Sequence, residues 1–335
     1  MEFRERITVV IPSRGREKYL IRSVLYWLSI GVRVRVCEDS ASPSLILSEM
    51  SETSPSLEYQ WSQDEPISQR LWESTMLVDT EFCIWSSDDE FVLPSALALC
   101  VRALDEESWV GCSGRSLGFW ISGKAPLFRS VYKPTVVIEE TIEDRLSQLL
   151  DNYSEPLLWN FYRTASLKLA AKAMNENDIS LGSASELTHA AAIAIQGKIG
   201  TIDGTMRLRS GENINQWKPN SKKFPNTKSW WEGAVSERNS MLKTLSNLTL
   251  DFNGGKQIQE SVVARSFQNY LNLDTPNQFE IFKSKVLFFI TFLVHRTVGP
   301  ALNRFRSKKY ELTLSAQEKN ELDKIRKVLL AFHRS

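Results

Sequence analysis

Strand-like and helix-like segments alternate along residues 7–113. Apolar runs typical of buried strands lie at residues 7–11, 32–37, 56–61, 81–85 and 109–113. Apolar residues at helical spacing predict helices between them, at residues 17–30, 44–50, 68–78 and 95–104. Because a helical crossover makes the two strands it joins parallel, we expect this half of the chain to form an α/β domain with a mostly parallel, Rossmann-like sheet and flanking helices.

Acidic clusters follow two of these predicted strands. Glu38 and Asp39 end the second strand, and the triplet 88–90 (Asp, Asp, Glu) comes shortly after the fourth. Carboxyl ends of parallel strands share one edge of a sheet, where ligands bind. Three adjacent carboxylates repel one another unless a cation or hydrogen-bond donors compensate, and hard oxygen ligands suit Mg²⁺ or Mn²⁺. An acidic cap on the helix that Pro94 opens explains the triplet equally well.

Composition excludes several classes of protein. The 41 Lys and Arg against 40 Asp and Glu leave a net charge of +1, so the chain as a whole is not built to bind nucleic acid. The most strongly apolar uncharged run, Val286–Val294, is too short to span a membrane, and the charged first residues indicate no signal peptide. Four cysteines without a CxxC pair predict buried, reduced thiols in a cytoplasmic protein, rather than a zinc site or disulfides.

The pattern changes from residue 216 onward. Residues 218–228 are polar with two prolines, and helical patterns follow at 230–250, 258–271, 277–298 and 315–332. We therefore expect an α/β domain over 1–215 and a helical C-terminal region over 216–335. Residues 281–310 carry seven Lys and Arg, no Asp or Glu and many aromatic residues, which suits the surface of an anionic membrane. Contact with another subunit, or a core helix with a basic rim, explains that stretch as well, and the oligomeric state stays open.

Three motifs follow one another in an order that resembles the GT-A glycosyltransferases, most closely the inverting family two. Residues Thr8–Arg16, Arg35–Ser40 and Ser86–Pro94 correspond to the family's V-V-I-P-T-x-N-R, V-V-D-D-G-S and D-x-D segments. The resemblance covers about residues 5–210. It implies a GT-A fold and transfer of a sugar from a nucleotide-diphosphate sugar to a saccharide or lipid-linked glycan, with inversion, in surface polysaccharide biosynthesis. It also implies a location in the cytoplasm or at the inner face of the cell membrane.

The resemblance further implies which residues bind the donor. Pro12, Ser13, Arg14 and either Glu38 or Asp39 would line the base pocket, and Asp88 would reach the ribose. Asp89, with Glu90 as a substitute ligand, would hold the Mg²⁺ or Mn²⁺ that neutralises the departing diphosphate. The D-x-D motif begins on Ser87 or on Asp88, so the assignment between Asp88 and Asp89 stays open.

Arg207 and Arg209 stand where family members often carry a metal-binding histidine. An arginine cannot bind a cation, but its guanidinium can bind phosphate through two parallel hydrogen bonds. The resemblance therefore assigns both arginines to the donor, either beside the metal or in a less metal-dependent enzyme. Solvated surface arginines are the alternative.

Glu186 is the candidate catalytic base. Residues Leu181–Ala190 resemble the family's Gly-x-Glu-Asp segment, with Ser185 where the family usually has Glu. An inverting transfer needs a carboxylate that takes the proton of the acceptor hydroxyl. A helix over 186–195 that Ser185 caps, with Glu186 in its first turn, is the structural alternative.

The prediction of acceptor-binding residues rests on weaker sequence signals. Trp159 and Tyr162 lie in a segment that resembles the family's acceptor-binding stretch, where aromatic rings stack on sugars, although core packing explains aromatic residues there as well. Asp144 and Arg145 are expected on an exposed helix face. Because Ser185 and the two arginines depart from the family pattern, a non-catalytic protein that binds a nucleotide or glycan on the same fold is the alternative function.

Overall fold

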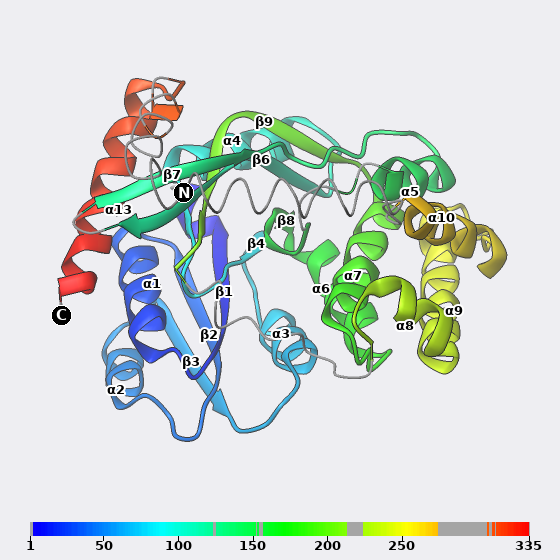
Figure 1. Ribbon diagram of the computed structural model, residues 1–335, viewed down its shortest axis with the longest axis horizontal. Coiled ribbons are helices and arrows are strands. Elements are labelled where there is room, and N and C mark those ends of the chain that lie inside the picture. Colours follow the sequence, from blue (N-terminus) through cyan, green and yellow to red (C-terminus); the bar gives the residue numbers. More distant parts are fainter. Residues whose placement is uncertain are drawn as a thin grey trace, which may run out of the picture.

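The computed structural model describes residues 3–122, 125–151, 153, 157–212, 224–273, 307, 310–311 and 313–334. Within them a single mixed sheet runs through the molecule, with helices on both faces (Figure 1). Its strands are β1 (Ile7–Arg14), β2 (Arg33–Asp39), β3 (Leu57–Ser62), β4 (Phe82–Trp85), β5 (Phe91–Val92), β6 (Gly111–Ser122), β7 (Ala125–Tyr132), β8 (Phe161–Arg163) and β9 (Ile199–Ser210). The spatial order is β3-β2-β1-β4-β8-β6-β9-β5, and β7 pairs with β6.

The first four strands confirm the expected parallel sheet. β1 pairs in parallel with β2 on one side and with β4 on the other, and β2 pairs in parallel with β3. Nearly every residue of β1, β2 and β4 is buried, as their continuous apolar sequences predict for strands covered on both faces. Their carboxyl ends, and therefore the two acidic clusters, lie at the same edge.

The second half of the sheet adds antiparallel strands to the expected parallel ones, so the sheet is mixed. β8 is antiparallel to both β4 and β6, β7 is antiparallel to β6, and β5 is antiparallel to β9; only β6 and β9 run parallel. The strand predicted at 109–113 is the start of β6, whose small residues lie beneath neighbouring side chains and whose continuation to Ser122 was not predicted. A Cβ on Gly111 would lie 2.4 Å from the Tyr162 ring, and one on Gly114 would lie 2.8 Å from Met206.

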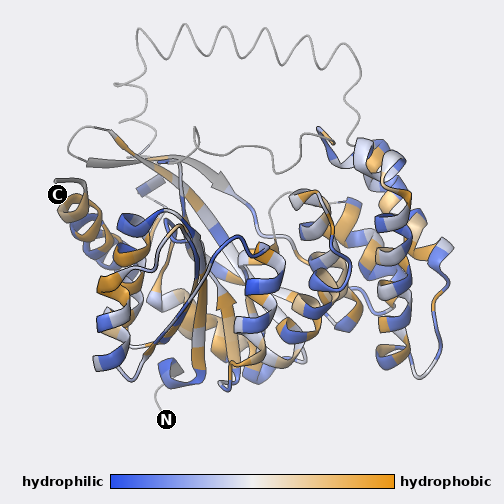
Figure 2. Ribbon diagram, turned by 90° about the horizontal axis from the view of Figure 1, so that it is seen from below, coloured by the Kyte–Doolittle hydropathy of each residue, from blue (hydrophilic) through white to orange (hydrophobic). Residues whose placement is uncertain are grey.

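Two hydrophobic clusters cover the two faces of the sheet. The helices are α1 (Glu17–Ser29), α2 (Leu45–Thr53), α3 (Ile67–Met76), α4 (Pro94–Glu106), α5 (Ile142–Asp151), α6 (Thr164–Asn175), α7 (Gly182–Gln196), α8 (Thr227–Gly233), α9 (Val235–Phe252), α10 (Glu260–Leu273) and α13 (Ala316–Arg334), with short 3₁₀ helices η1 (Phe3–Arg6) and η2 (Leu157–Trp159). Helices α3 and α5–α10 contribute to one cluster, and α1, α2, α4 and α13 to the other. Figure 2 shows these apolar surfaces facing the interior.

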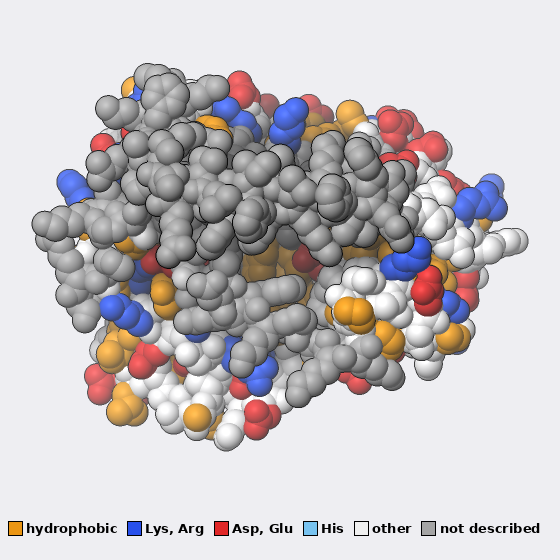
Figure 3. All heavy atoms as spheres, viewed as in Figure 1, with side chains coloured by type: hydrophobic (Ala, Val, Ile, Leu, Met, Phe, Trp, Pro, Cys, Tyr) orange, Lys and Arg blue, Asp and Glu red, His pale blue; other side chains and the backbone are white. Residues whose placement is uncertain are grey.

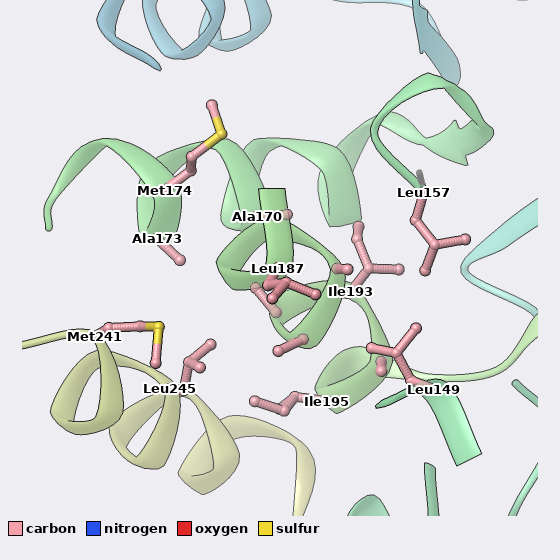
Figure 4. Packing of buried hydrophobic residues seen from close by; sticks show 14 of the residues in the cluster. Leu149, Leu157, Ala170, Ala173, Met174, Leu187, Ile193, Ile195, Met241 and Leu245 are labelled. Carbon is pink, nitrogen blue, oxygen red and sulfur yellow. The ribbon is translucent and has the colours of Figure 1, made fainter. Parts of the chain in front are cut away.

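The residues after 216 join these two clusters instead of forming a core of their own within the described chain. Helices α9 and α10 pack on α7 and α5, and Figure 4 shows Met241 and Leu245 of α9 facing Ala173 and Leu187. The last helix, α13, returns to the opposite face beside α1 and α4 (Figure 1). There Glu321 accepts hydrogen bonds from the backbone N–H and hydroxyl of Ser95 at the start of α4.

Most helix predictions are confirmed, with local differences. The helix expected over 230–250 is broken at Ala234 into α8 and α9, and α8 begins earlier than expected, at Thr227, with the side chain of Asn226 as its N-cap. The helix expected over 277–298 lies outside the described residues, as does most of the basic stretch 281–310. No helix in the described part of the chain has the length and apolarity needed to cross a membrane. All four cysteines are free and buried, as predicted.

Charged side chains of both signs alternate over the described part of the face drawn in Figure 3, with no extended patch of one sign. This mixture agrees with the net charge of +1. Nucleic-acid binding relies on a coherent basic surface. The described part of this face therefore offers no such surface.

Arg145 is buried, not exposed as the sequence suggested. Its guanidinium donates hydrogen bonds to the carbonyls of Ala194 and Ile195 at the end of α7 and to those of Glu139 and Glu140. Burial lowers the Arg145 pKa from its usual value, while the nearby Glu140 and Glu143 raise it. The residue thus fixes the carboxyl end of the helix that carries Glu186.

Replacing Arg145 with methionine should lower the free energy of unfolding by about 3 kcal/mol, because it leaves buried carbonyls without donors. Urea unfolding followed by circular dichroism measures this. The control is Lys172→Met on α6, whose exposed ammonium pairs with Glu176 one helical turn away and should change stability by less than about 0.5 kcal/mol. Equal effects of the two substitutions would contradict the capping role.

Candidate functional site

The turn after β1 brings the first motif to the sheet edge. Arg14 is opposite Asp39 in the parallel pair, and the backbone N–H of Gly15 donates to the carbonyl of Asp39 (3.0 Å). Gly15 has φ +61°, a left-handed conformation that strains other residues, so it allows the tight turn into α1. The side chain of Arg14 is largely exposed, with its Nε 3.0 Å from Oδ2 of Asp39.

Glu38 and Asp39 point to different partners, as neighbours on a strand do. Glu38 accepts a hydrogen bond from the Tyr59 hydroxyl of β3 (2.6 Å). Asp39 contacts Arg14 and accepts a hydrogen bond from the backbone N–H of Asp64 (3.0 Å). Of the two carboxylates, Asp39 is therefore the one beside the exposed end of β1.

Arg70 of α3 is a site residue that the sequence analysis did not identify. It is 3% exposed, and its Nη1 donates to the carbonyls of Ser13 (3.0 Å) and Cys37 (2.7 Å). Its Nη2 lies 4.0 Å from Asp39. Arg70 thus ties the carboxyl ends of β1 and β2 together, and its place in an amphipathic helix gave no sign of this.

Arg16 pairs with the first two carboxylates of the triplet. Its Nε donates to Asp88 (3.0 Å), a second nitrogen contacts the other Asp88 oxygen, and Nη1 lies 3.5 Å from Asp89. Asp88 also accepts a hydrogen bond from the Ser13 hydroxyl (2.6 Å), and Asp89 accepts one from Ser87 (2.6 Å). Burial raises the pKa of Asp88 to about 6 despite the nearby Arg16. Arg16 belongs to the first motif, but its sequence context gave no sign of this pairing.

Glu90 is placed between Arg207 and Arg209 by strand pairing. β5 begins directly after Glu90 and runs antiparallel to β9, with Val92 opposite Arg207. The Nε atoms of Arg207 and Arg209 lie 3.7 and 3.8 Å from the Glu90 carboxylate. Arg207 is nearly buried, while Arg209 is partly exposed and lies over the ring of Tyr132 (4.7 Å). Neither arginine is a freely solvated surface residue.

Glu186 lies on α7, where the charges of Arg207 and Arg209 act on it. Helix α7 begins at Gly182, so Glu186 is in its second turn, and Ser185 is not the N-cap; both differ from the expectation. The extra turn escaped the sequence analysis because residues 182–185 lack apolar periodicity. Burial raises the pKa of Glu186, and the hydrogen bond from the Tyr153 hydroxyl (2.6 Å) and the charges of Arg209 and Arg207 oppose that rise.

The aromatic residues predicted on the acceptor side occupy different environments. Tyr162 is fully buried, its hydroxyl donates to the carbonyl of Leu157 (2.5 Å), and its ring lies 5.9 Å from that of His189. Its ring has no exposed face on which a sugar could stack. Tyr162 therefore belongs to the core, which was the alternative explanation for aromatic residues in this segment. Trp159 is partly exposed at the rim of the same cluster. His189 is fully buried against Trp85, and burial lowers its pKa to about 3.

A series of contacts joins Asp39 through the triplet to the arginines of β9, and the charges of those arginines act on Glu186. Asp39 contacts the end of β1, whose Ser13 hydroxyl binds Asp88. The next residues, Asp89 and Glu90, lead to Arg207 and Arg209, whose charges act on Glu186. The loops after β1, β2 and β4 and the end of β9 therefore meet Glu186 at the carboxyl edge of the sheet.

The triplet suits a divalent cation only in part. Among the described residues, no three His, Cys, Asp or Glu side chains gather closely enough to hold a metal ion. Each of the three carboxylates already contacts an arginine: Arg16 lies against Asp88 and 3.5 Å from Asp89, and Arg207 lies 3.7 Å from Glu90. Mg²⁺ is commonly bound by one or two carboxylates together with substrate phosphates. A cation here would therefore depend on one carboxylate of the triplet together with phosphate oxygens of a bound donor.

Comparison with known proteins gives a structural likeness but no sequence match. No family model matches the chain, and a search of curated proteins finds no significant match. The structure of S. aureus TarS 1–349 in complex with UDP-GlcNAc superposes with a TM-score of 0.51 and 16% identity, over 79% of this chain and 71% of that one. Another structure of the same fragment gives 0.49 and 16%, over 79% and 70%. At this identity the likeness shows the fold alone, and this chain has a GT-A glycosyltransferase-like fold.

Proposed function

We propose that the protein transfers a sugar from a nucleotide-diphosphate sugar to a saccharide or lipid-linked acceptor. The observation that carries the proposal is the meeting of Asp39, the 88–90 triplet, Arg207 and Glu186 at the carboxyl edge of a GT-A-like sheet. Ligands of open α/β sheets bind at that edge. A nucleotide, a diphosphate and an acceptor hydroxyl each find a chemically suited partner there.

The nucleoside occupies the ends of β1 and β2 in this proposal. Asp39 accepts hydrogen bonds from the base, and Arg14 covers it from the exposed side. Asp88 accepts hydrogen bonds from the ribose, since it lies under the end of β1 beside Ser13. Pro12 and the buried Glu38 shape the floor of the pocket from within the sheet.

The diphosphate lies between Asp89 and the two arginines of β9. Arg207 and Arg209 bring positive charge to phosphate oxygens that gain negative charge as the glycosidic bond breaks. Asp89 would hold a Mg²⁺ or Mn²⁺, which would supply further charge neutralisation to the same oxygens. Arg16 keeps the carboxylates of Asp88 and Asp89 in place.

Glu186 acts as the base. Its carboxylate takes the proton of the acceptor hydroxyl while the oxygen attacks the anomeric carbon, and the nucleoside diphosphate leaves on the opposite side. Attack from the face opposite the leaving group inverts the anomeric configuration. The proposal includes an acceptor from surface polysaccharide biosynthesis and a location at the cytoplasmic side of the membrane.

Isothermal titration with UDP, GDP, CDP and ADP, each with and without Mn²⁺, tests the donor site. UDP comes first, because the TarS structures were determined with UDP-GlcNAc and with UDP. We expect one diphosphate to bind with a Kd below about 1 mM, more tightly with Mn²⁺ present. The matching nucleoside without phosphates serves as the control and should bind at least about tenfold more weakly. No binding of any diphosphate would overturn the proposal.

A further inference from the structure

Tyr153 is hydrogen-bonded to the candidate base. It lies in the connection between α5 and η2, and its hydroxyl donates to Oε1 of Glu186 at 2.6 Å. The residue is partly buried at the edge of the hydrophobic cluster. Burial and the adjacent Glu186 raise the pKa of Tyr153 well above its usual value, so the phenol keeps its proton and can only donate to the carboxylate.

The ring of Tyr153 is held from the C-terminal helices. Tyr270 of α10 meets it edge-to-face, with ring centroids 6.2 Å apart at 87°. Helix α10 is itself anchored, because Val263 and Phe267 are buried and Phe267 stacks on Trp231 of α8 (5.6 Å, 16°). The helices after residue 216 thereby reach the base through one aromatic contact.

We propose that Tyr153 is a positioning residue for Glu186, and that α10 holds Tyr153 in place through Tyr270. This inference rests on the proposed function only for the identity of the reaction; the contact itself does not depend on it. It makes the C-terminal helices part of the site rather than an appended region.

This contact affects both the orientation of the Glu186 carboxylate and its affinity for a proton. A phenol bound to Oε1 fixes the rotation of the carboxylate and leaves Oε2 for the acceptor hydroxyl. A donor to the charged form of a carboxyl also lowers its pKa, which keeps Glu186 ionised although burial favours the neutral acid. The other charged groups that act on Glu186 are Arg207 and Arg209 of β9, and His189 on the next turn of α7 is neutral.

The test replaces Tyr153 with phenylalanine, which keeps the ring and its contact with Tyr270. The pKa of Glu186 is measured by carbon-13 NMR on protein labelled at glutamate side chains, with E186Q identifying the signal. We expect this pKa to rise by about one unit in Y153F, and the acid limb of the kcat profile to move up by the same amount. At neutral pH kcat should fall about tenfold with the donor KM unchanged.

Two further variants separate positioning from a general loss of structure. Tyr270→Leu removes the supporting ring and should shift the Glu186 pKa in the same direction by a smaller amount. Tyr310→Phe removes a hydroxyl beside the opposite hydrophobic cluster and should shift nothing. An unchanged Glu186 pKa in both folded Y153F and folded Y270L would overturn the inference. If the pKa shifts but the wild-type protein transfers no sugar, the contact stands and the proposed reaction fails.

Discussion

Replacing Glu186 with glutamine should lower kcat by about three orders of magnitude and leave the Kd for the nucleoside diphosphate within about threefold. Glutamine has nearly the same shape but cannot accept the acceptor's proton, and base catalysis of this kind contributes about 10²–10⁴ in rate. Donor binding is preserved because Asp39, Asp88 and the arginines of β9 are untouched. Nucleotide release during turnover and titration calorimetry measure the two quantities.

A matched control is Glu232→Gln, the same substitution at an exposed position of α8. It should leave both quantities unchanged. If E186Q turns over at the wild-type rate, another group takes the proton and the assignment of Glu186 is wrong. If the wild-type protein binds a nucleoside diphosphate but transfers no sugar to any acceptor, the alternative of a non-catalytic binding protein becomes the better description.

The parallel part of the fold was predictable because its signals are local. Continuous apolar runs such as Ile7–Ile11 exist only where both faces of a strand are covered, and helical periodicity between them fixes the crossovers. The acidic residues that end β2 and follow β4 then fall at one edge by topology alone. The positions of Asp39 and Asp88 relative to β1 followed from the same reasoning.

The antiparallel part was not predictable because its strands depend on distant partners. The strand predicted at 109–113 marks only the start of β6, and the rest of β6, with Gly114 under neighbouring side chains, shows no strand pattern in the sequence. β5 is two residues long and exists only through its pairing with β9. That pairing, invisible in the sequence, is what brings Glu90 to Arg207.

The sequence identified the residues that belong to motifs, but not the residues that hold those motif residues in place. Asp39 and Asp88 belong to motifs that follow one another in a recognisable order along the chain. The supporting residues, Arg16, Arg70 and Tyr153, instead contact segments far away in the sequence. A charged residue on a helix is expected to be exposed unless its partner is known. Tyr162 shows the reverse case, since its aromatic character fitted a sugar platform but the structure buries it beneath β6.

Replacing Arg207 with methionine should weaken binding of the nucleoside diphosphate about 100-fold and lower kcat/KM by about 10³. The guanidinium is nearly buried, and Arg207 brings positive charge to the place where we put the diphosphate. A charge held in such a site acts more strongly on the departing phosphate than on the ground state, so the rate falls more than the affinity. Arg209→Met should lower affinity and kcat/KM by factors about tenfold smaller. Arg209 is partly exposed, and its guanidinium also lies over the ring of Tyr132.

The readout that isolates the phosphate contact is a comparison of ligands by calorimetry. R207M should lose affinity for the diphosphate but keep its affinity for the nucleoside alone, because the base and ribose contacts at β1 and β2 are unaltered. Arg102→Met on the exposed face of α4 provides the control for loss of one positive charge. Circular dichroism and the thermal midpoint establish that R207M is folded, with Glu90 still paired to Arg209. Equal losses for diphosphate and nucleoside would mean that Arg207 supports the pocket without touching phosphate, and the charge that stabilises the leaving group would then have to come from a cation at Asp89.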